Sequence, residues 1–236
     1  MKVALLGYGK MGKEIESILM ERGHSVDYIL NSEGKQKGDE LGEIDVAIEF
    51  STPATVMDNI NACFDVSIPI VTGTTGWDQN LDEITNKCMK GNNTLFYASN
   101  FSIGVNIFFA INKKLAEIMN THPEYNINME ETHHVEKLDA PSGTAISLAN
   151  DVLSNISRKS NWINTGYPDE NEIKITSNRE GEVPGTHIIN YDSSIDHIEI
   201  KHTAKNRRGF ALGAVLAAEW VKDKRGVFNM SNFLNT

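Results

Sequence analysis

Two histidines, a lysine and a Pro-Ser-Gly-Thr string lie close together between His133 and Thr144. A histidine side chain titrates near pH ~6.5, so it can deliver a proton at neutral pH. Lys137 adds a positive charge, while Ser142 and Gly143 stand where a helix is predicted to begin. Helix N-terminal amides, hydroxyl groups and a lysine together favour a carboxylate or a phosphate. The segment therefore predicts an anion site beside a proton donor.

Two other interpretations of the adjacent histidines, His133 and His134, stay open. They could form a surface or capping pair without a chemical role. They could also bind a metal, but neighbouring histidines share one ion less readily than an i, i+4 pair on a helix. The sequence offers neither an H-E-x-x-H string nor a cysteine near them. We therefore predict no metal site.

A glycine motif near the start of the chain predicts a second kind of site. Gly7, Gly9 and Gly12 spell G-x-G-x-x-G between an apolar run and a predicted helix. The first glycine permits a tight turn, the second lets the backbone approach a pyrophosphate, and the third lets helix and strand pack closely. An ordinary glycine-rich turn is the alternative. In this setting we predict a dinucleotide site with contacts from Gly7, Tyr8, Gly9, Lys10, Met11 and Gly12.

Three later loops rich in glycine, threonine and asparagine follow predicted strands. In open α/β sheets a ligand lies outside the carboxyl ends of the strands. These loops could offer amides and hydroxyls to a nicotinamide, although turn and capping chemistry would use the same residue types. One loop is Ser51-Thr52-Pro53. From the other two we predict cofactor contacts by Gly73, Thr74, Thr75, Ala98, Ser99, Asn100 and Phe101.

The residues after the second predicted strand leave the choice between NADH and NADPH open. Glu33 could accept hydrogen bonds from a ribose 2′-hydroxyl. Ser32, Lys35 and Lys37 could instead hold a 2′-phosphate, and we include Ser32 among the predicted cofactor contacts. A solvated loop without either role is an equal alternative.

The hydrophobic pattern of the first hundred residues predicts the scaffold for these sites. Short apolar runs alternate with segments of helical periodicity, of which the first carries Met11, Ile15 and Ile18 on one stripe. This alternation indicates a parallel sheet covered by helices on both faces. The predicted strands are Lys2–Leu6, Val26–Leu30, Asp45–Phe50, Ile68–Thr72 and Leu95–Ala98; further helices follow Pro53 and cover about Leu81–Met89.

The pattern changes after Phe101 and indicates a second domain. Ile127 and Met129 alternate with polar residues, which is typical of a strand with one wet face. Asp139-Ala140-Pro141 argues against continuing that strand, so a loop must bring His133 and Lys137 together. Short turns suggest a mixed or antiparallel sheet. Helices are predicted near Val105–Met119, Thr144–Ser157 and Phe210–Val221, the last assignable to either domain; further strands include Ile173/Ile175, Ile188–Tyr191 and Ile198/Ile200, with a hairpin at Ser193-Ser194.

Composition excludes several classes of protein. The chain has 236 residues and a formal net charge of −10, which argues against a nucleic-acid-binding protein because those need a broad basic face. No run reaches the ~18 apolar residues of a membrane span, so we predict no membrane association. Two isolated cysteines fit a reducing, cytoplasmic setting. An anionic ligand must therefore find a local basic patch against the global charge.

Together these motifs resemble the 4-hydroxy-tetrahydrodipicolinate reductase (dihydrodipicolinate reductase) family over essentially the whole chain. The most specific match is Glu131–Ala145, which contains the H-H-x-x-K-x-D-A-P-S-G-T-A spelling. Gly7–Gly12, Gly73–Gly76, Asn100–Asn106 and Arg179–His187 also match. The chain departs from the family after its second strand, where the residues that select the cofactor are not recognisable.

The resemblance implies an α/β fold, with a Rossmann-like, parallel-sheet dinucleotide-binding domain that holds an inserted α+β, mixed-sheet substrate domain. The first domain would comprise residues 1–102 and 203–236. The second, residues 103–202, would bind the substrate and build a homotetramer through its sheet. NADPH or NADH would be the cofactor and a small dicarboxylate the substrate.

The resemblance also implies an activity, the reduction of 4-hydroxy-tetrahydrodipicolinate to tetrahydrodipicolinate with loss of water in diaminopimelate and lysine biosynthesis. His133 and Lys137 would be catalytic, and the substrate would be bound by His134, Ser142, Gly143 and Thr144. A reductase of a different imine or keto acid, a non-catalytic dinucleotide-binding regulator and a zinc hydrolase remain alternatives. Arg179 could face the substrate or form a loop salt bridge, and we assign no role to His187, His197 and His202.

Overall fold

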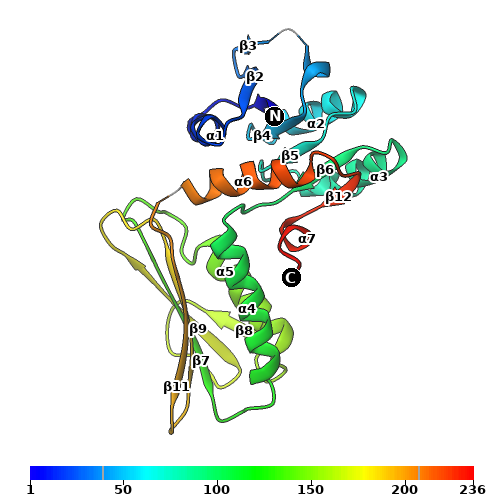
Figure 1. Cartoon of the computed structure of the whole chain (residues 1–236). Coiled ribbons are helices and arrows are strands. Elements are labelled where there is room, and N and C mark those ends of the chain that lie inside the picture. Colours follow the sequence, from blue (N-terminus) through cyan, green and yellow to red (C-terminus); the bar gives the residue numbers. More distant parts are fainter. Residues whose placement is uncertain (39, 207) are drawn as a thin grey trace. The chain divides into compact units, whose positions relative to one another are not determined.

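The computed structural model describes residues 1–38, 40–206 and 208–236. These residues form two compact units. The first comprises Met1–Ile103 and Arg208–Thr236, and the second comprises Gly104–Arg207. Each unit has its own sheet and its own hydrophobic core (Figure 1). No helix formed by the described residues is long and apolar enough to span a membrane.

The first unit is built on a sheet that has seven strands in the described residues. Neighbouring strands pair in parallel, except that β3 runs antiparallel to β2. The spatial order is β12-β6-β5-β4-β1-β2-β3. The predicted parallel sheet is thereby confirmed. The strands are β1 (Lys2–Leu6), β2 (Ser25–Asn31), β3 (Gly34–Lys37), β4 (Val46–Glu49), β5 (Ile70–Thr72), β6 (Thr94–Tyr97) and β12 (Gly226–Phe228).

Helices cover both faces of this sheet, as the near-continuous apolar strands predict. Because side chains alternate along a strand, Val3 and Leu5 join a core with helices α1 and α6, while Ala4 and Leu6 join a second core with α2 and α3. The helices and short 3₁₀ turns are α1 (Lys10–Glu21), η1 (Leu41–Glu43), α2 (Val56–Asp65), η2 (Asp78–Asn80), α3 (Leu81–Lys90), α6 (Arg208–Val221) and α7 (Met230–Leu234).

The hydrophobic pattern alone does not assign helix α6 to either domain. In the structure this helix lies in the first unit. It packs closely against the segment between β6 and α4 (Ile103–Met119), because a Cβ on Gly213 would lie 1.7 Å from the carbonyl oxygen of Phe101. A side chain of any size at this position would push the helix away from the core. The Phe101 ring itself is buried and contacts Phe96, with 5.8 Å between ring centroids.

The second unit is a mixed sheet with helices on one face. Its strand order is β11-β10-β7-β9-β8, where β10 pairs antiparallel with both β11 and β7 and the other pairs are parallel. Helices α4 and α5 pack on the inward side chains of this sheet (Figure 1). The elements are α4 (Ile103–Met119), β7 (Asn126–His133), α5 (Gly143–Asn155), β8 (Asn161–Ile163), β9 (Glu172–Arg179), β10 (Thr186–Asp192) and β11 (His197–Thr203).

Four short elements were not predicted: β3, β8, β12 and α7. Each has three to five residues, and such segments are too short to show a hydrophobic period. The expected start of β5 at Ile68 is also wrong, because that strand begins at Ile70. The hairpin at Ser193-Ser194 is confirmed, and Ser193 closes it through hydrogen bonds with Asp196.

Candidate active site

The predicted proton donor, His133, is the last residue of β7. Its side chain continues the inward face of that strand, which also carries Ile127, Met129 and Glu131, and it is 8% exposed. The chain then leaves the sheet, and Lys137 lies in the loop that follows. The expectation that a loop joins these two residues is therefore right for Lys137 and wrong for His133, which the sheet itself positions.

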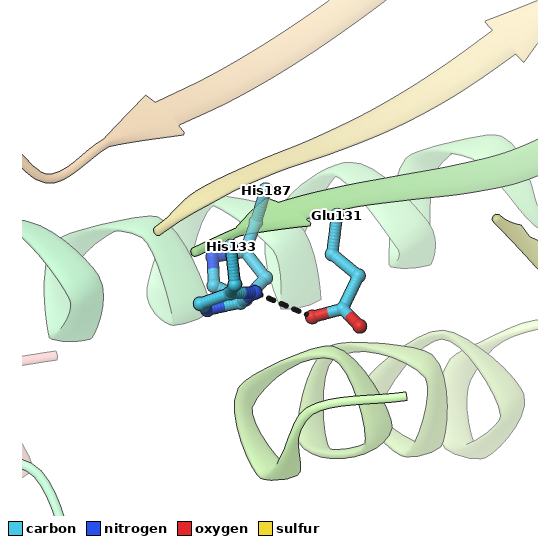
Figure 2. A group of neighbouring side chains, drawn as sticks. All are labelled: Glu131, His133 and His187. Atoms are coloured by element: carbon cyan, nitrogen blue, oxygen red, sulfur yellow. Dashed lines mark ion pairs between the residues drawn. The ribbon is translucent and has the colours of Figure 1, made fainter. Parts of the chain in front are cut away.

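A buried carboxylate holds the imidazole of His133. Oε2 of Glu131 lies 2.9 Å from Nδ1 of His133, and Glu131 is 1% exposed. Figure 2 shows the two side chains meeting on the same side of β7. The other ring nitrogen, Nε2, lies against Gly185, where a Cβ would come within 2.9 Å of it. Glu131 thus contacts the imidazole of His133 on one side, and Gly185, which has no side chain, leaves room for the ring on the other.

Arg179, at the end of β9, ties the carboxylate to the loop. Its Nη1 and Nη2 groups donate to Oε1 of Glu131 at 3.3 Å. Its Nε donates to the carbonyl oxygen of Lys137 at 3.1 Å, and Nη2 donates to that of Asp139 at 2.5 Å. Of the two roles that the sequence left open for Arg179, the salt bridge is the one observed. One guanidinium therefore anchors both the partner of His133 and the loop that carries Lys137.

Lys137 faces an anion in this structure. Its Nζ donates to both carboxylate oxygens of Asp139 at 2.8 Å. The hydrogen bond from Lys137 lowers the pKa of the Asp139 carboxyl. Asp139 is exposed while the Lys137 side chain is 22% exposed, so an arriving carboxylate would compete with Asp139 for the ammonium group.

The segment predicted to hold an anion lies at the start of α5, which begins at Gly143. Ser142 is the N-cap, and its Oγ accepts a hydrogen bond from the amide of Ala145 at 3.2 Å. The Ser142 amide itself donates to Oε1 of Glu131 at 3.1 Å. Gly143 is exposed and Thr144 is half-buried. Because Ser142 is committed to the cap and to Glu131, the groups that face outward come from Gly143 and Thr144.

His187, on β10, completes a buried cluster with Glu131 and His133 (Figure 2). Its ring meets that of His133 edge to face, with 5.1 Å between centroids, and its Nε2 lies 3.2 Å from Oγ of Ser142. His187 is 6% exposed. Its contacts support the N-cap and the face of the His133 ring. His134, by contrast, lies half-buried in the loop, where its carbonyl accepts the amide of Lys137.

Burial governs the protonation of this cluster. It lowers the pKa of His133, an effect that Glu131 partly offsets and Lys137 reinforces. It lowers the pKa of His187 to about 4. Burial alone would raise the pKa of Glu131, but hydrogen bonds from Ser142 and the charge of His133 outweigh it and the pKa is lowered. A negative carboxylate beside two neutral imidazoles is therefore the resting state near pH 7.

Glu131, His133 and His187 also bring donor atoms within 4.8 Å of one another, which is close enough for a shared metal ion. The contacts of Glu131 favour a different use of the cluster. One of its oxygens pairs with His133 and the other faces the Arg179 guanidinium, whose positive charge would repel a divalent cation. We therefore treat the cluster as a carboxylate–histidine pair with a neighbouring histidine.

The glycine loop of the first unit has the shape that a dinucleotide needs. Gly7 has φ +99°, and a Cβ there would lie 2.0 Å from the carbonyl oxygen of Phe50. A Cβ on Gly12 would lie 2.5 Å from the carbonyl oxygen of Gly7. A Cβ on Gly9 would meet nothing within 4 Å, so its backbone borders open space. Gly9 is also the N-cap of α1 and supplies no side-chain cap, which leaves the first amides of the helix for a ligand.

Two pockets lie at the carboxyl ends of β4, β5 and β6. Met11, Gly73, Thr74 and Thr75 line the first together with Phe50, Ser51 and Pro53. Thr74, Thr75, Ala98 and Ser99 line the second together with Trp77, Asp78, Leu81 and Tyr97. Several predicted cofactor residues therefore lie at the same edge of the sheet as Gly9. Gly12 packs against the backbone of Gly7 in the glycine loop. The pockets are lined by six others: Met11, Gly73, Thr74, Thr75, Ala98 and Ser99.

Other predicted cofactor residues are placed differently. Ser32 lies exposed in the turn between β2 and β3. Tyr8 points its hydroxyl to Glu16 on α1. Lys10 opens α1 and is exposed, and Asn100 accepts the amide of Ser102 at 2.9 Å. The ring of Phe101 is in the core, so Phe101 offers a ligand its backbone only.

The sequence reasoning did not select Glu131, Gly185 or Glu49. Glu131 had a readable signal, because it falls on the inward face when the alternation of Ile127 and Met129 is extended by one step. A charged residue on an inward face needs a partner. Gly185 had no such local signal, because its contact with His133 joins residues distant in sequence. Glu49 did have one, because it is a charged residue within a predicted apolar strand.

Comparison with known proteins gives one family for both halves of the chain. The model for "Dihydrodipicolinate reductase, N-terminus" matches residues 1–101, and the model for "Dihydrodipicolinate reductase, C-terminus" matches residues 104–234. A 4-hydroxy-tetrahydrodipicolinate reductase of Christiangramia forsetii is 49% identical over 100% of this chain and 98% of its own. One from Wigglesworthia glossinidia brevipalpis is 37% identical over 82% of this chain and 68% of its own.

A solved structure supports the fold. The dipicolinate-bound dihydrodipicolinate reductase from Paenisporosarcina sp. TG-14 superposes with a TM-score of 0.77 and covers 99% of both chains at 21% sequence identity. At that identity the match speaks for the architecture alone.

Proposed function

The chain belongs to the dihydrodipicolinate reductase family, and from this premise we propose how its residues carry out the reaction. The reaction reduces 4-hydroxy-tetrahydrodipicolinate to tetrahydrodipicolinate with NAD(P)H and releases water, as a step of diaminopimelate and lysine biosynthesis. The full-length identity to a relative of that activity carries this conclusion. The geometry of the two sites supports the roles of individual residues.

The first unit fits a dinucleotide. The open space beside Gly9 and the uncapped amides of α1 suit a pyrophosphate, and the pocket residues Thr74, Thr75 and Ser99 suit the nicotinamide end. When bound, the reduced nicotinamide would supply a hydride to ring C4 of the substrate, after the C4 hydroxyl group has left as water. The protein orients the reacting atoms and excludes competing reactions.

The second unit supplies the charges that hold a dicarboxylate. We assign one substrate carboxylate to Lys137 and the N-terminus of α5 at Gly143 and Thr144, and assign His134 to the other. Lys137 would exchange Asp139 for the substrate. Ser142 acts through the cap rather than by its hydroxyl. These groups are the local basic patch that an acidic chain needs for an anionic ligand.

His133 supplies the proton that the reduction requires, or polarises the group that receives it. Hydride addition places electron density on the ring imine system, which must be discharged by a proton. His133 is neutral in the resting site because burial lowers its pKa. Two substrate carboxylates would raise that pKa and load the proton as the substrate binds. Glu131, held by Arg179, places Oε2 2.9 Å from Nδ1 as a charge partner for the imidazolium, and we assign Nε2 as the nitrogen that gives up the proton.

We propose that both reduced cofactors bind. The turn after β2 offers Glu33 for a ribose 2′-hydroxyl and Ser32 with Lys35 for a 2′-phosphate. Glu33 and Ser32 are both exposed, so neither is committed to the core.

A homotetramer built through the second sheet is proposed as the working assembly. The face that carries Asn126, Asn128 and Glu130 lies opposite the face packed on α4 and α5, so it is the one left for a partner copy. The expected mass in solution is four times 26.2 kDa. The buried free thiols of Cys63 and Cys88 suit a reducing compartment, and we propose the cytoplasm.

Steady-state kinetics on enzymatically generated 4-hydroxy-tetrahydrodipicolinate test the function. We expect oxidation of NADH and of NADPH that depends on this substrate, with tetrahydrodipicolinate as product. Imines derived from amino acids serve as the comparison substrates. Faster turnover of one of those imines would assign the chain to another substrate, and binding of NAD(P)H without turnover would make it a regulator.

Replacing Gly9 by Ala is expected to weaken dinucleotide binding by about tenfold or more, equivalent to ~1.4 kcal/mol. The new methyl group meets no protein atom within 4 Å, so the fold tolerates it, but it occupies the space through which a pyrophosphate approaches. Titration of the fluorescence of NADPH measures the change. Gly42→Ala is the matched control, because Gly42 also has no atom within 4 Å of a Cβ. Equal affinities of the two variants would contradict the prediction.

A further inference from the structure

We propose that Glu49 is a positioning residue that holds together the two loops lining the cofactor pocket of the first unit. The proposal rests on the proposed function for the identity of the ligand, a nicotinamide dinucleotide. Glu49 is the last residue of β4, a central strand of the sheet, and it is 0% exposed. It does not touch the open space of the pocket, so it acts through its neighbours.

Both oxygens of the Glu49 carboxylate accept hydrogen bonds. Oε1 accepts the amide of Ser51 at 3.0 Å, the hydroxyl of Thr74 at 3.0 Å and also the Ser51 hydroxyl. Oε2 accepts the hydroxyl of Thr72 at 2.5 Å. Asn59, on α2, adds a longer contact of 3.4 Å from its Nδ2. Every one of these donors is a neutral group.

A buried carboxylate without a cation is an expensive feature. In the described part of the chain no lysine, arginine or histidine forms an ion pair with Glu49. Burying an unpaired charge costs free energy unless hydrogen bonds replace the lost water, and a neutral or apolar residue at the end of β4 would avoid that cost. The set of donors around Glu49 therefore points to a role for which a multiple acceptor is needed.

That role is visible in where the donors come from. Ser51 belongs to the loop after β4, whereas Thr74 belongs to the loop after β5, and both residues line the pocket with Met11. The amide of Ser51 also donates to Oγ1 of Thr74 at 2.9 Å. The carboxylate is thus the common partner of two loops that are otherwise separate in sequence. With it, the pocket walls are set before the cofactor arrives, so less ordering is needed on binding.

The test separates positioning from simple stability. We would prepare Glu49→Gln, Glu49→Asp and a control, Val221→Ala. Val221 is fully buried and lies near the end of α6. Two residues earlier in this helix, Glu219 accepts hydrogen bonds from Arg22 and contacts His24, and both of these residues come just before β2. Val221 therefore lies at the edge of the sheet where the strands begin, away from the loops that carry Ser51 and Thr74. Its replacement by Ala lowers the stability of the fold by removing packed atoms. Melting temperatures and the Kd values of NADH and NADPH, from fluorescence titration without substrate, are measured for each.

We expect Glu49→Gln to raise both Kd values by at least about tenfold, because it replaces an acceptor oxygen by a donor that faces hydroxyl and amide donors. Glu49→Asp keeps the charge and should restore part of the affinity. Val221→Ala should keep the wild-type Kd in spite of its lower melting temperature. If Glu49→Gln binds the cofactor no more weakly than Val221→Ala, the proposal is wrong.

A second variant decides the matter if Glu49→Gln does not fold. Thr72→Val keeps the volume of a buried side chain and removes only the donor to Oε2. We expect it to raise the Kd severalfold, and an unchanged Kd would overturn the proposal. Because binding is measured without substrate, a wild-type chain that binds the cofactor but reduces nothing would refute the proposed function and leave the claim about Glu49 standing.

Discussion

Replacing His133 by Gln is expected to lower kcat by about 10²- to 10⁴-fold, the usual cost of losing a positioned proton donor. Gln keeps much of the volume and can still contact Glu131, but it cannot transfer a proton. Lys137→Ala should also collapse kcat, because the ammonium group assists the same step and holds the substrate. Both residues lie in the second unit, so the Kd of NAD(P)H should stay near the wild-type value.

The matched control for His133→Gln is His197→Gln. His197 is an exposed histidine of β11 that pairs with Asp192, and its replacement should leave kcat unchanged. Steady-state kinetics and fluorescence titration of the cofactor on all three variants provide the comparison. Unchanged turnover in both His133→Gln and Lys137→Ala would remove these two residues from the mechanism.

Acidification is expected to destabilise the chain between about pH 6.5 and pH 4 because of His187. Burial lowers the pKa of His187 to about 4 in the folded state, against an ordinary value of 6.5. Within that window the unfolded state binds a proton that the folded state does not, so the free energy of unfolding falls as the pH falls. A difference of this size corresponds to roughly 3 kcal/mol at full effect. Burial also lowers the pKa values of His133 and His202, which adds in the same direction.

Urea unfolding at pH 7 and at pH 5, on the wild type and on His187→Leu, measures this effect. Leucine fills the buried position without a titrating group, so the variant should lose less stability on acidification than the wild type. The hydrogen bond between His187 and Ser142 is lost in the variant at every pH, and the comparison of slopes removes that constant cost. An identical slope for the two proteins would show that His187 is not the origin of the acid sensitivity.

The scaffold of the first unit was predictable because its strands are buried on both faces. The predicted bounds of β1, Lys2–Leu6, match the structure. A lysine precedes this apolar run and a glycine follows it, and these two residues mark where the strand begins and ends. Strands β3 and β12 escaped detection for the opposite reason. Lys35 and Lys37 make β3 a polar edge strand without an apolar run. Strand β12 has only three residues, and its strand conformation depends on pairing with β6, which is distant in sequence.

The candidate site residues that the sequence could select are the ones that are local in sequence. His133, Lys137 and Ser142 share one short segment, so their spelling was enough to select them. The groups that surround His133 in the folded chain are not local in sequence. Arg179 and His187 reach it from β9 and β10, which are neighbours of β7 only after the second sheet has formed. Sequence spacing cannot reveal a contact that depends on this pairing.

The predicted loop after β5 shows the same limit in another form. Thr74 was selected for a hydroxyl that faces the cofactor. In the structure that hydroxyl donates to Oε1 of Glu49, so Thr74 offers a ligand its backbone and the remaining lone pair of its oxygen. Thr74 lines a pocket, and its contact with a cofactor stays a prediction. Its observed hydrogen bond depends on a carboxylate that only the folded sheet brings close to it.

The most direct test of the account is to follow the hydride itself. Reduced cofactor labelled with deuterium at the transferable C4 position is incubated with the chain and 4-hydroxy-tetrahydrodipicolinate, and the product is analysed by mass spectrometry and NMR. The account predicts one deuterium at ring C4 of tetrahydrodipicolinate in the wild type, and a strongly reduced rate of the same transfer in His133→Gln. A tetrahydrodipicolinate product without deuterium, or no consumption of the cofactor, would contradict it.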